Sequence, residues 1–123
     1  MPERARVEAF IAAVVGGGHV KAIADYYHDD ASMQENLKEP RRGRALLMEH
    51  EANALKRLQR MHTHPNPPFA VTGDHVAINW TFDATAPDGV TRRLHEVAFQ
   101  RWQGDRIIEE RFYYDTASAW RNV

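Results

Sequence analysis

The sequence predicts an α+β fold, in which three helices pack on one face of a curved, mostly antiparallel sheet. In the first half of the chain, apolar residues recur at helical spacing around one short strand-like segment. The second half changes to alternating residues divided by the turn sequences TGDH, APDG and QGDR. An order of helices followed by a run of strands is typical of this fold class.

The first two helices are expected on either side of a glycine triplet. Residues 3–15 place apolar side chains on one face, and Pro2 suits a first turn. Residues 16–18, all glycine, then end this helix, because glycine readily takes the left-handed conformation of a helix end. Residues 19–28 repeat the helical spacing, so we expect a second, short helix there.

A strand and a longer helix complete the first half. Residues 29–37 alternate, with Ala31, Met33 and Glu35 on one side. The segment KEPRRGR is expected to be a loop, because it contains proline and glycine. Residues 45–61 are predicted to form the third helix, whose basic residues near the C-terminus suit the helix dipole.

Four strands are predicted in the second half, joined as an antiparallel meander. Three prolines make the first of them irregular or place it at an edge, because proline cannot donate a ladder hydrogen bond. The predicted strands cover residues 62–72, 75–85, 90–102 and 106–115.

Composition narrows the classes of protein to which the chain can belong. The 123 residues favour a single domain spanning residues 1–123, and 43% apolar residues are enough for a packed core. A net charge of −1 gives no electrostatic footprint for nucleic acid or an anionic membrane. The absence of cysteine excludes disulfides and thiolate sites. No signal-peptide pattern or membrane-length apolar run occurs, so we expect a cytoplasmic location.

Three segments resemble the nuclear transport factor 2-like superfamily, and within it the SnoaL-like proteins, which are related to polyketide cyclases and ketosteroid isomerase. They are ADYYHDDASMQE (24–35), RRGRALLMEHE (41–51) and LHEVAFQRWQGDRIIEERFYYD (94–115). The resemblance implies a cystatin-like cone, in which the curved sheet wraps over the long helix and leaves an apolar pocket. It also implies a small hydrophobic molecule as ligand and a homodimer formed through the sheet.

Two candidate catalytic residues follow from this resemblance. Glu35 aligns with the catalytic carboxylate of the isomerases, although the polar segment QENLKE is also consistent with a solvated side chain. His95 forms the more apolar face of LHEVAFQRW with Val97 and Phe99, so we expect it to point inward. There it would lie near the isomerase acid that donates to the oxyanion. The alternative is a core histidine bonded to a backbone carbonyl.

Glu110 is the third candidate catalytic residue. The family register places one set of residues inward: Ile108, Glu110, Phe112 and Tyr114. It places the other set outward: Ile107, Glu109, Arg111 and Tyr113. A buried carboxylate needs a partner. His95 on the neighbouring strand could supply it, and the alternative is an ion pair with Arg93 or Arg101.

Aromatic and aliphatic side chains are expected to form the wall of the pocket. Trp80 shares a strand face with apolar neighbours and could pack against a planar ligand. The isomerase oxyanion tyrosine would fall near Ile11, which cannot donate a hydrogen bond, so steroid isomerisation is not expected. The predicted lining residues are Phe10, Val14, Tyr27, Met33, Trp80, Val97, Phe99, Phe112 and Tyr114.

The sequence therefore leaves two functions open. One is an acid–base enzyme of the isomerase, cyclase or dehydratase type, acting without a cofactor on a small hydrophobic substrate. The other is a non-catalytic dimeric domain that binds a ligand or another protein. His62 and His64 share a strand face and could form a metal site together with Glu35, but no spacing in the sequence requires such a site. We expect neither a metal nor a cofactor.

Overall fold

The computed structural model describes the backbone of residues 1–123 and every side chain except that of residue 65. The helices are α1 (Arg4–Val15), α2 (His19–Tyr26) and α3 (Arg44–Lys56). The longer strands are β1 (Tyr27–Glu35), β3 (Arg60–Thr72), β4 (His75–Thr85), β5 (Thr91–Gln103) and β6 (Arg106–Tyr113). Two short strands are β2 (Arg41–Arg42) and β7 (Arg121–Asn122).

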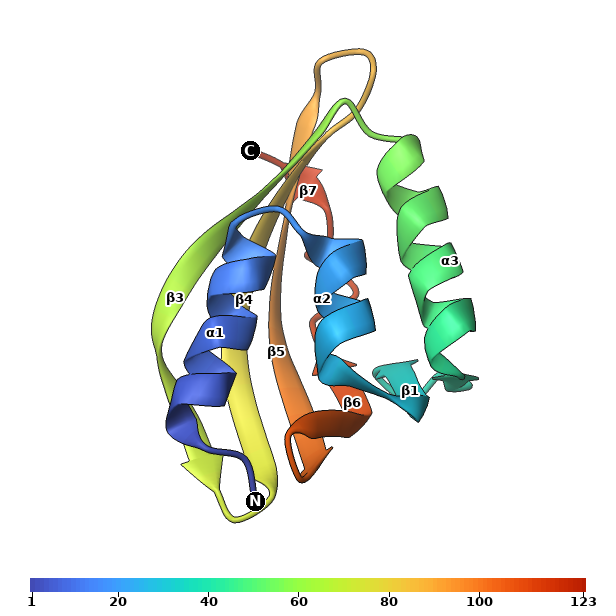
Figure 1. The fold of residues 1–123 in the computed structure, drawn as a ribbon. Coiled ribbons are helices and arrows are strands. Elements are labelled where there is room, and N and C mark those ends of the chain that lie inside the picture. Colours follow the sequence, from blue (N-terminus) through green and yellow to red (C-terminus); the bar gives the residue numbers. More distant parts are fainter.

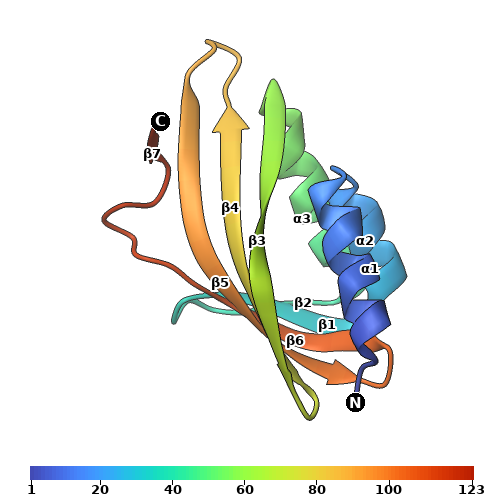
Figure 2. The ribbon, with the colours of Figure 1, turned by 90° about the vertical axis from the view of Figure 1, so that its left-hand side faces the viewer.

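One mixed sheet forms the body of the molecule, and the three helices lie together on one side of it (Figure 1). Its strand order is β2-β1-β6-β5-β4-β3, and β7 pairs with β5. The pair β1–β6 is parallel, and the other pairs are antiparallel. Figure 2 shows the curvature, with β1, β2 and β6 running across the lower ends of β3, β4 and β5. The expected α+β fold is confirmed.

Two helices end earlier than their apolar spacing predicts. Helix α2 stops at Tyr26, because Tyr27 takes extended backbone angles and begins β1. Helix α3 stops at Lys56 and not at residue 61. Shortly after it, the backbone N–H of Gln59 donates to the carbonyl of Thr85, so pairing with the sheet has replaced the helix. The predicted loop before α3 contains the short strand β2.

The core is built around Phe10 of α1. Its ring meets four aromatic side chains edge to face, with centroid distances from 5.4 to 6.5 Å. These come from α2, β1, β4 and β5, so one side chain joins the first helix to the sheet. The four are Tyr26, Tyr27, Trp80 and Trp102.

Strand β6 contains an irregularity that decides which of its residues face inward. Trp102 pairs with Ile107 while Arg101 pairs with Glu109, so Ile108 is an extra residue, a β-bulge. Ile107 and Glu110 are consequently both buried. The expected inward position of Glu110 is therefore found, but the expected orientations of Ile107 and Ile108 are wrong, because a regular alternation was assumed.

No helix among the described residues is both long enough and apolar enough to cross a membrane.

Candidate active site

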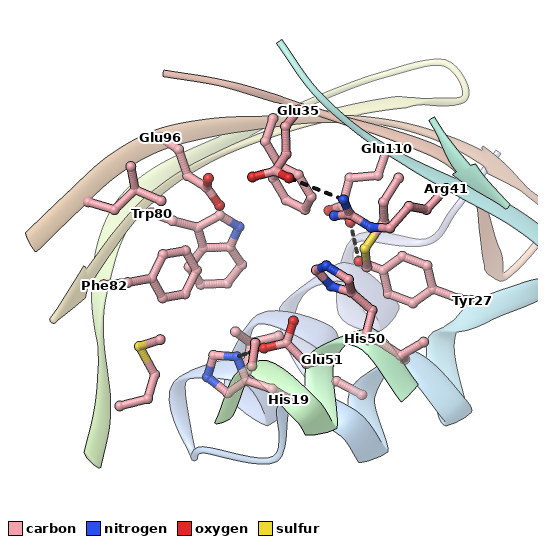
Figure 3. A pocket seen from close by; sticks show the side chains of 18 of the residues that line it. His19, Tyr27, Glu35, Arg41, His50, Glu51, Trp80, Phe82, Glu96 and Glu110 are labelled. Atoms are coloured by element: carbon pink, nitrogen blue, oxygen red, sulfur yellow. Dashed lines mark hydrogen bonds and ion pairs between the residues drawn. The ribbon is translucent and has the colours of Figure 1, made fainter. Parts of the chain in front are cut away.

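A cavity of about 230 Å³ lies between the sheet and the helices α2 and α3 (Figure 3). Carboxyl groups enter it from the sheet and from α3, and aromatic rings form much of its wall. Its lining residues include Tyr27, Met33, Glu35, Arg41, Trp80, Phe82, Glu96, Glu110 and Phe112 on the sheet side. Those on the helix side include Val14, His19, Ile23, His50 and Glu51.

Glu35, the last residue of β1, is held by two donors. Its Oε2 lies 3.2 Å from Nη1 of Arg41, and its Oε1 accepts a hydrogen bond of 2.9 Å from the hydroxyl of Tyr114. The side chain is about one-third exposed and forms an ion pair with Arg41. The Nε of Arg41 is buried and has no hydrogen-bond partner among the described residues. Glu35 is therefore a carboxyl group held at the edge of the cavity by Arg41 and Tyr114.

Glu96 enters the same cavity from β5 in a different environment. The residue is only 8% exposed, and no described residue forms a hydrogen bond or an ion pair with its carboxyl group. Burial raises the pKa of Glu96 to about 8, and the neighbouring carboxyls of Glu110, Glu35 and Glu51 add to the effect. Glu96 therefore carries its proton at neutral pH and can donate it to a ligand.

Glu110 lies deeper in the sheet and is fully engaged by other side chains. Its carboxyl accepts a hydrogen bond from the hydroxyl of Tyr27 and one of 2.6 Å from Nε2 of Gln100. The indole N–H of Trp102 in turn donates to Oε1 of Gln100 at 3.0 Å. Burial raises the pKa of Glu110 to about 7, although the bonds from Tyr27 and Gln100 oppose this. Glu110 belongs to a buried network in the wall of the cavity.

The helix side of the cavity holds a second polar group. Nδ1 of His19 lies 3.7 Å from Oε1 of Glu51, and Nε2 of His19 lies 3.1 Å from the hydroxyl of Thr63. Burial lowers the pKa of His19 and raises the pKa of Glu51, so both groups are shifted toward their neutral forms. Figure 3 shows this pair across the cavity from Glu35 and Glu96.

Aromatic rings separate the two polar ends. Trp80 and Phe82 are stacked on the sheet side, with centroids 5.7 Å apart and planes 29° from parallel. Tyr27 lies on the other side of the cavity in Figure 3. A planar apolar ligand can pack against such walls.

The expected inward position of His95 is wrong. His95 is exposed on the outer face of β5, where its ring contacts the hydroxyl of Thr81. Val97 and Phe99 lie on the same outer face and are 41% and 45% exposed, so they do not line the cavity. The residues of β5 that face inward are Leu94, Glu96, Ala98, Gln100 and Trp102. Because two of them are polar, the apolar content of the two faces predicted the wrong face to be the inward one.

The other predicted site residues fall into two groups. Val14, Tyr27, Met33, Glu35, Trp80, Glu110 and Phe112 line the cavity. Phe10 instead lies in the core behind it, and Tyr114 reaches it only through its bond to Glu35. The expected pair of Glu110 with His95, Arg93 or Arg101 does not form, because Arg93 bonds Asp83 and Arg101 bonds Glu109.

Sequence reasoning missed Glu96, Arg41 and the pair of His19 with Glu51. The inward position of Glu96 could have been predicted, because Glu96 and Trp102 fall on the same face of an alternating strand and Trp102 is the largest side chain of β5. The meeting of His19 and Glu51 had no comparable signal, since it depends on how α2 and α3 cross. Among the described residues, no group of three or more metal-ligating side chains is placed to hold a metal ion.

Comparison with known proteins gives a family and a fold. The model of the SnoaL-like domain matches residues 7–110. A candidate SnoaL-like polyketide cyclase from Mesorhizobium loti is 23% identical, with a TM-score of 0.76 over 93% of this chain and 100% of that one. A protein from Catenulispora acidiphila with a ketosteroid isomerase-like fold is 19% identical, with a TM-score of 0.76 over 97% and 91% of the two chains.

A further similar structure is a nuclear transport factor 2-like protein from Burkholderia pseudomallei. It is 17% identical, with a TM-score of 0.76 over 91% of this chain and 89% of that one. The search of curated proteins found no match to the chain. At these identities the solved structures establish a shared fold.

Proposed function

Because the chain belongs to the SnoaL-like domain family, we propose that it is an acid–base enzyme that moves a proton beside a carbonyl group of a small, largely apolar substrate. One observation carries the proposal. Two carboxyl groups, Glu35 and Glu96, enter one cavity in opposite environments. Environments that drive two carboxyl groups toward different protonation states are a common basis for assigning a base and an acid.

Glu35 is the base in this proposal. Its carboxylate takes the proton from a carbon next to the carbonyl, and the electron pair of that C–H bond moves toward the carbonyl oxygen. Glu96 donates its proton or a hydrogen bond to this oxygen, which stabilises the enol. Return of the proton from Glu35 to a different carbon of a conjugated enol, with the enol proton returning to Glu96, gives an isomer. In a ring closure, the enol carbon attacks a second carbonyl carbon, the proton held by Glu35 passes to the new alkoxide oxygen, and the enol proton returns to Glu96.

Glu110 assists without touching the reacting atoms. It is the first of the neighbouring carboxyls that add to the raised pKa of Glu96. Its own position is fixed by Tyr27 and Gln100. Glu110 is therefore a positioning residue that adds to the effect of burial on the pKa of Glu96.

Exchange of hydrogen for deuterium tests the proposal without knowledge of the natural substrate. The probe is 2-tetralone, an apolar bicyclic ketone with exchangeable C–H bonds beside its carbonyl. In D₂O, the wild-type protein should accelerate loss of these proton NMR signals. Glu35→Gln and Glu96→Leu should each slow the catalysed exchange roughly a hundredfold or more, because one removes the base and the other the donor.

His95→Ala is the matched control, because it alters the residue next to Glu96 on the opposite face of the same strand. This variant should exchange at the wild-type rate. Exchange at the rate of buffer alone with wild-type protein would contradict the proposal. Unchanged exchange in both cavity variants would contradict the roles of Glu35 and Glu96.

The second candidate is a non-catalytic dimeric domain that binds a ligand or another protein. It is favoured by the outer face of the sheet, where Val97, Phe99 and Tyr113 are each more than 40% exposed. It is also favoured by Ile11, which stands where the resemblance would place an oxyanion tyrosine. Binding of 2-tetralone in the cavity without any exchange would support this alternative.

A further inference from the structure

We infer that the cavity is built for a substrate with two polar ends: a carbonyl group at Glu35 and Glu96, and a hydroxyl group that binds between His19 and Glu51. This inference rests on the proposed function and names the class of substrate, a planar apolar molecule with a hydroxyl opposite its reactive carbonyl.

The two side chains face one another without a direct hydrogen bond. The distance of 3.7 Å from Nδ1 of His19 to Oε1 of Glu51 is longer than a hydrogen bond. No described residue forms a hydrogen bond with the carboxyl of Glu51. An oxygen atom to one side of the line between these two atoms can lie about 2.8 Å from each, within hydrogen-bonding distance of both.

A hydroxyl group matches this pair in either tautomer of His19. When Thr63 donates to Nε2, Nδ1 carries the proton and donates to the hydroxyl, which donates to the carboxylate of Glu51. When Nε2 carries the proton, Nδ1 accepts from the hydroxyl, which accepts from protonated Glu51. A carbonyl oxygen can only accept, so it fits fewer of these states.

Charge favours a neutral ligand group over an ion at this end. Burial lowers the pKa of His19 and raises the pKa of Glu51, so neither charge is stabilised. The side chain of His19 is only 10% exposed, and its ring lies 5.9 Å from that of Phe82. The pair of His19 and Glu51 therefore lies next to the aromatic wall, so a ligand that packs along Trp80 and Phe82 can reach this pair (Figure 3).

Two ketones test the inference on the unchanged protein. Isothermal titration calorimetry compares 2-tetralone with 6-hydroxy-2-tetralone, which carries a hydroxyl at the end opposite its carbonyl. The hydroxyl should tighten binding to the wild-type protein by roughly fivefold to tenfold, the worth of one good hydrogen bond. This comparison does not depend on the folding of any variant.

Variants then locate the effect. Glu51→Leu and His19→Phe should each reduce the gain from the hydroxyl to less than about twofold, because each removes one hydrogen-bonding partner. Glu51→Gln, which keeps a hydrogen-bonding group, should retain part of the gain. Glu49→Leu is the matched control, because it makes the same substitution at an exposed position of α3. It should retain the full gain.

The outcomes separate this inference from the proposed function. Catalysed exchange of 2-tetralone with equal affinities for the two ketones would overturn this inference alone. A gain that persists in both Glu51→Leu and His19→Phe would overturn it as well. If wild-type protein neither binds nor exchanges either ketone, the proposed function fails and the inference fails with it.

Discussion

At the scale of single residues, the carboxyl of Glu96 links the proposed chemistry to the stability of the fold. Burial of an acid without a hydrogen-bonding partner favours its neutral form. Glu96 gains this environment only when the chain folds, so the folded state binds its proton more tightly than the unfolded state. A group that suits proton donation therefore makes the protein sensitive to alkaline pH.

Stability should fall as the pH rises from about 5 to above 8. The pKa of Glu96 is about 8 in the folded protein and that of Glu110 is about 7, both above the ordinary value of 4.5. Their stabilising contribution is complete below the unfolded value and is lost as pH rises through the folded values. Glu96→Gln should therefore raise the melting temperature at pH 9 by roughly 3–6 °C or more.

The same substitution should have little effect at pH 5, because Glu96 is then neutral in both states. Calorimetry at the two pH values measures the difference. Glu109→Gln, an exposed acid on the outer face, is the control and should show no such dependence on pH. An equal shift in melting temperature at pH 5 and pH 9 for Glu96→Gln would contradict the buried, partnerless position of the carboxyl.

At the scale of secondary-structure elements, the sequence predicted where strands lie better than which way their residues face. In β5 the inward set includes Glu96 and Gln100, so hydrophobicity favoured the set of His95, Val97 and Phe99. In β6 the single extra residue Ile108 reverses the alternation on one side of the bulge. Functional polar residues and bulges are both local exceptions that a periodic pattern does not reveal.

Phe10 is the aromatic side chain by which helix α1 packs against the sheet. Phe10 is 2% exposed and contacts rings from three other elements besides α2. Phe10→Ala should lower the free energy of unfolding by about 3–5 kcal/mol, because it removes a buried ring and leaves a cavity. Denaturant unfolding measures this change.

The exposed acid Glu8 on the same helix provides the control for Phe10. Glu8→Ala should change the free energy of unfolding by no more than about 0.5 kcal/mol. A loss of less than about 1 kcal/mol in Phe10→Ala would show that α1 is held in place by other contacts.

At the scale of the whole molecule, the outer face of the sheet offers a surface for a homodimer, which we propose as the assembled state. Val97 and Tyr113 are paired across β5 and β6, and Phe99 stacks on His75 beside them. Phe99→Glu should convert the dimer to a monomer, because it places a charge within this apolar patch. Sedimentation equilibrium measures the mass.

Gln103→Glu is the control for the dimer, because it adds the same charge at an exposed position near the end of β5. This variant should remain dimeric. A monomeric wild-type protein, or a dimeric Phe99→Glu variant, would contradict assembly through this face.

The sequence was sufficient for the α+β class, the order of the main elements and the positions of Glu35 and Glu110. Local spacing and turn residues carry that information, and the resemblance to a family supplied the register of β6 from Glu109 onward. The pair of His19 with Glu51 could not be found in this way. Its residues lie on two helices, and the distance between them depends on packing that involves the whole chain.

The parallel pairing of β1 with β6 has a consequence for the order in which the molecule is completed. The bond between Tyr27 and Glu110 joins residues 83 positions apart, and the bond between Glu35 and Tyr114 joins residues 79 apart. A chain still emerging from the ribosome contains β1 long before it contains β6, so this wall of the cavity cannot close before β6 has been synthesised. Contacts of such long range also slow folding. The proposed chemistry therefore has to wait until β6 has been synthesised and has paired with β1.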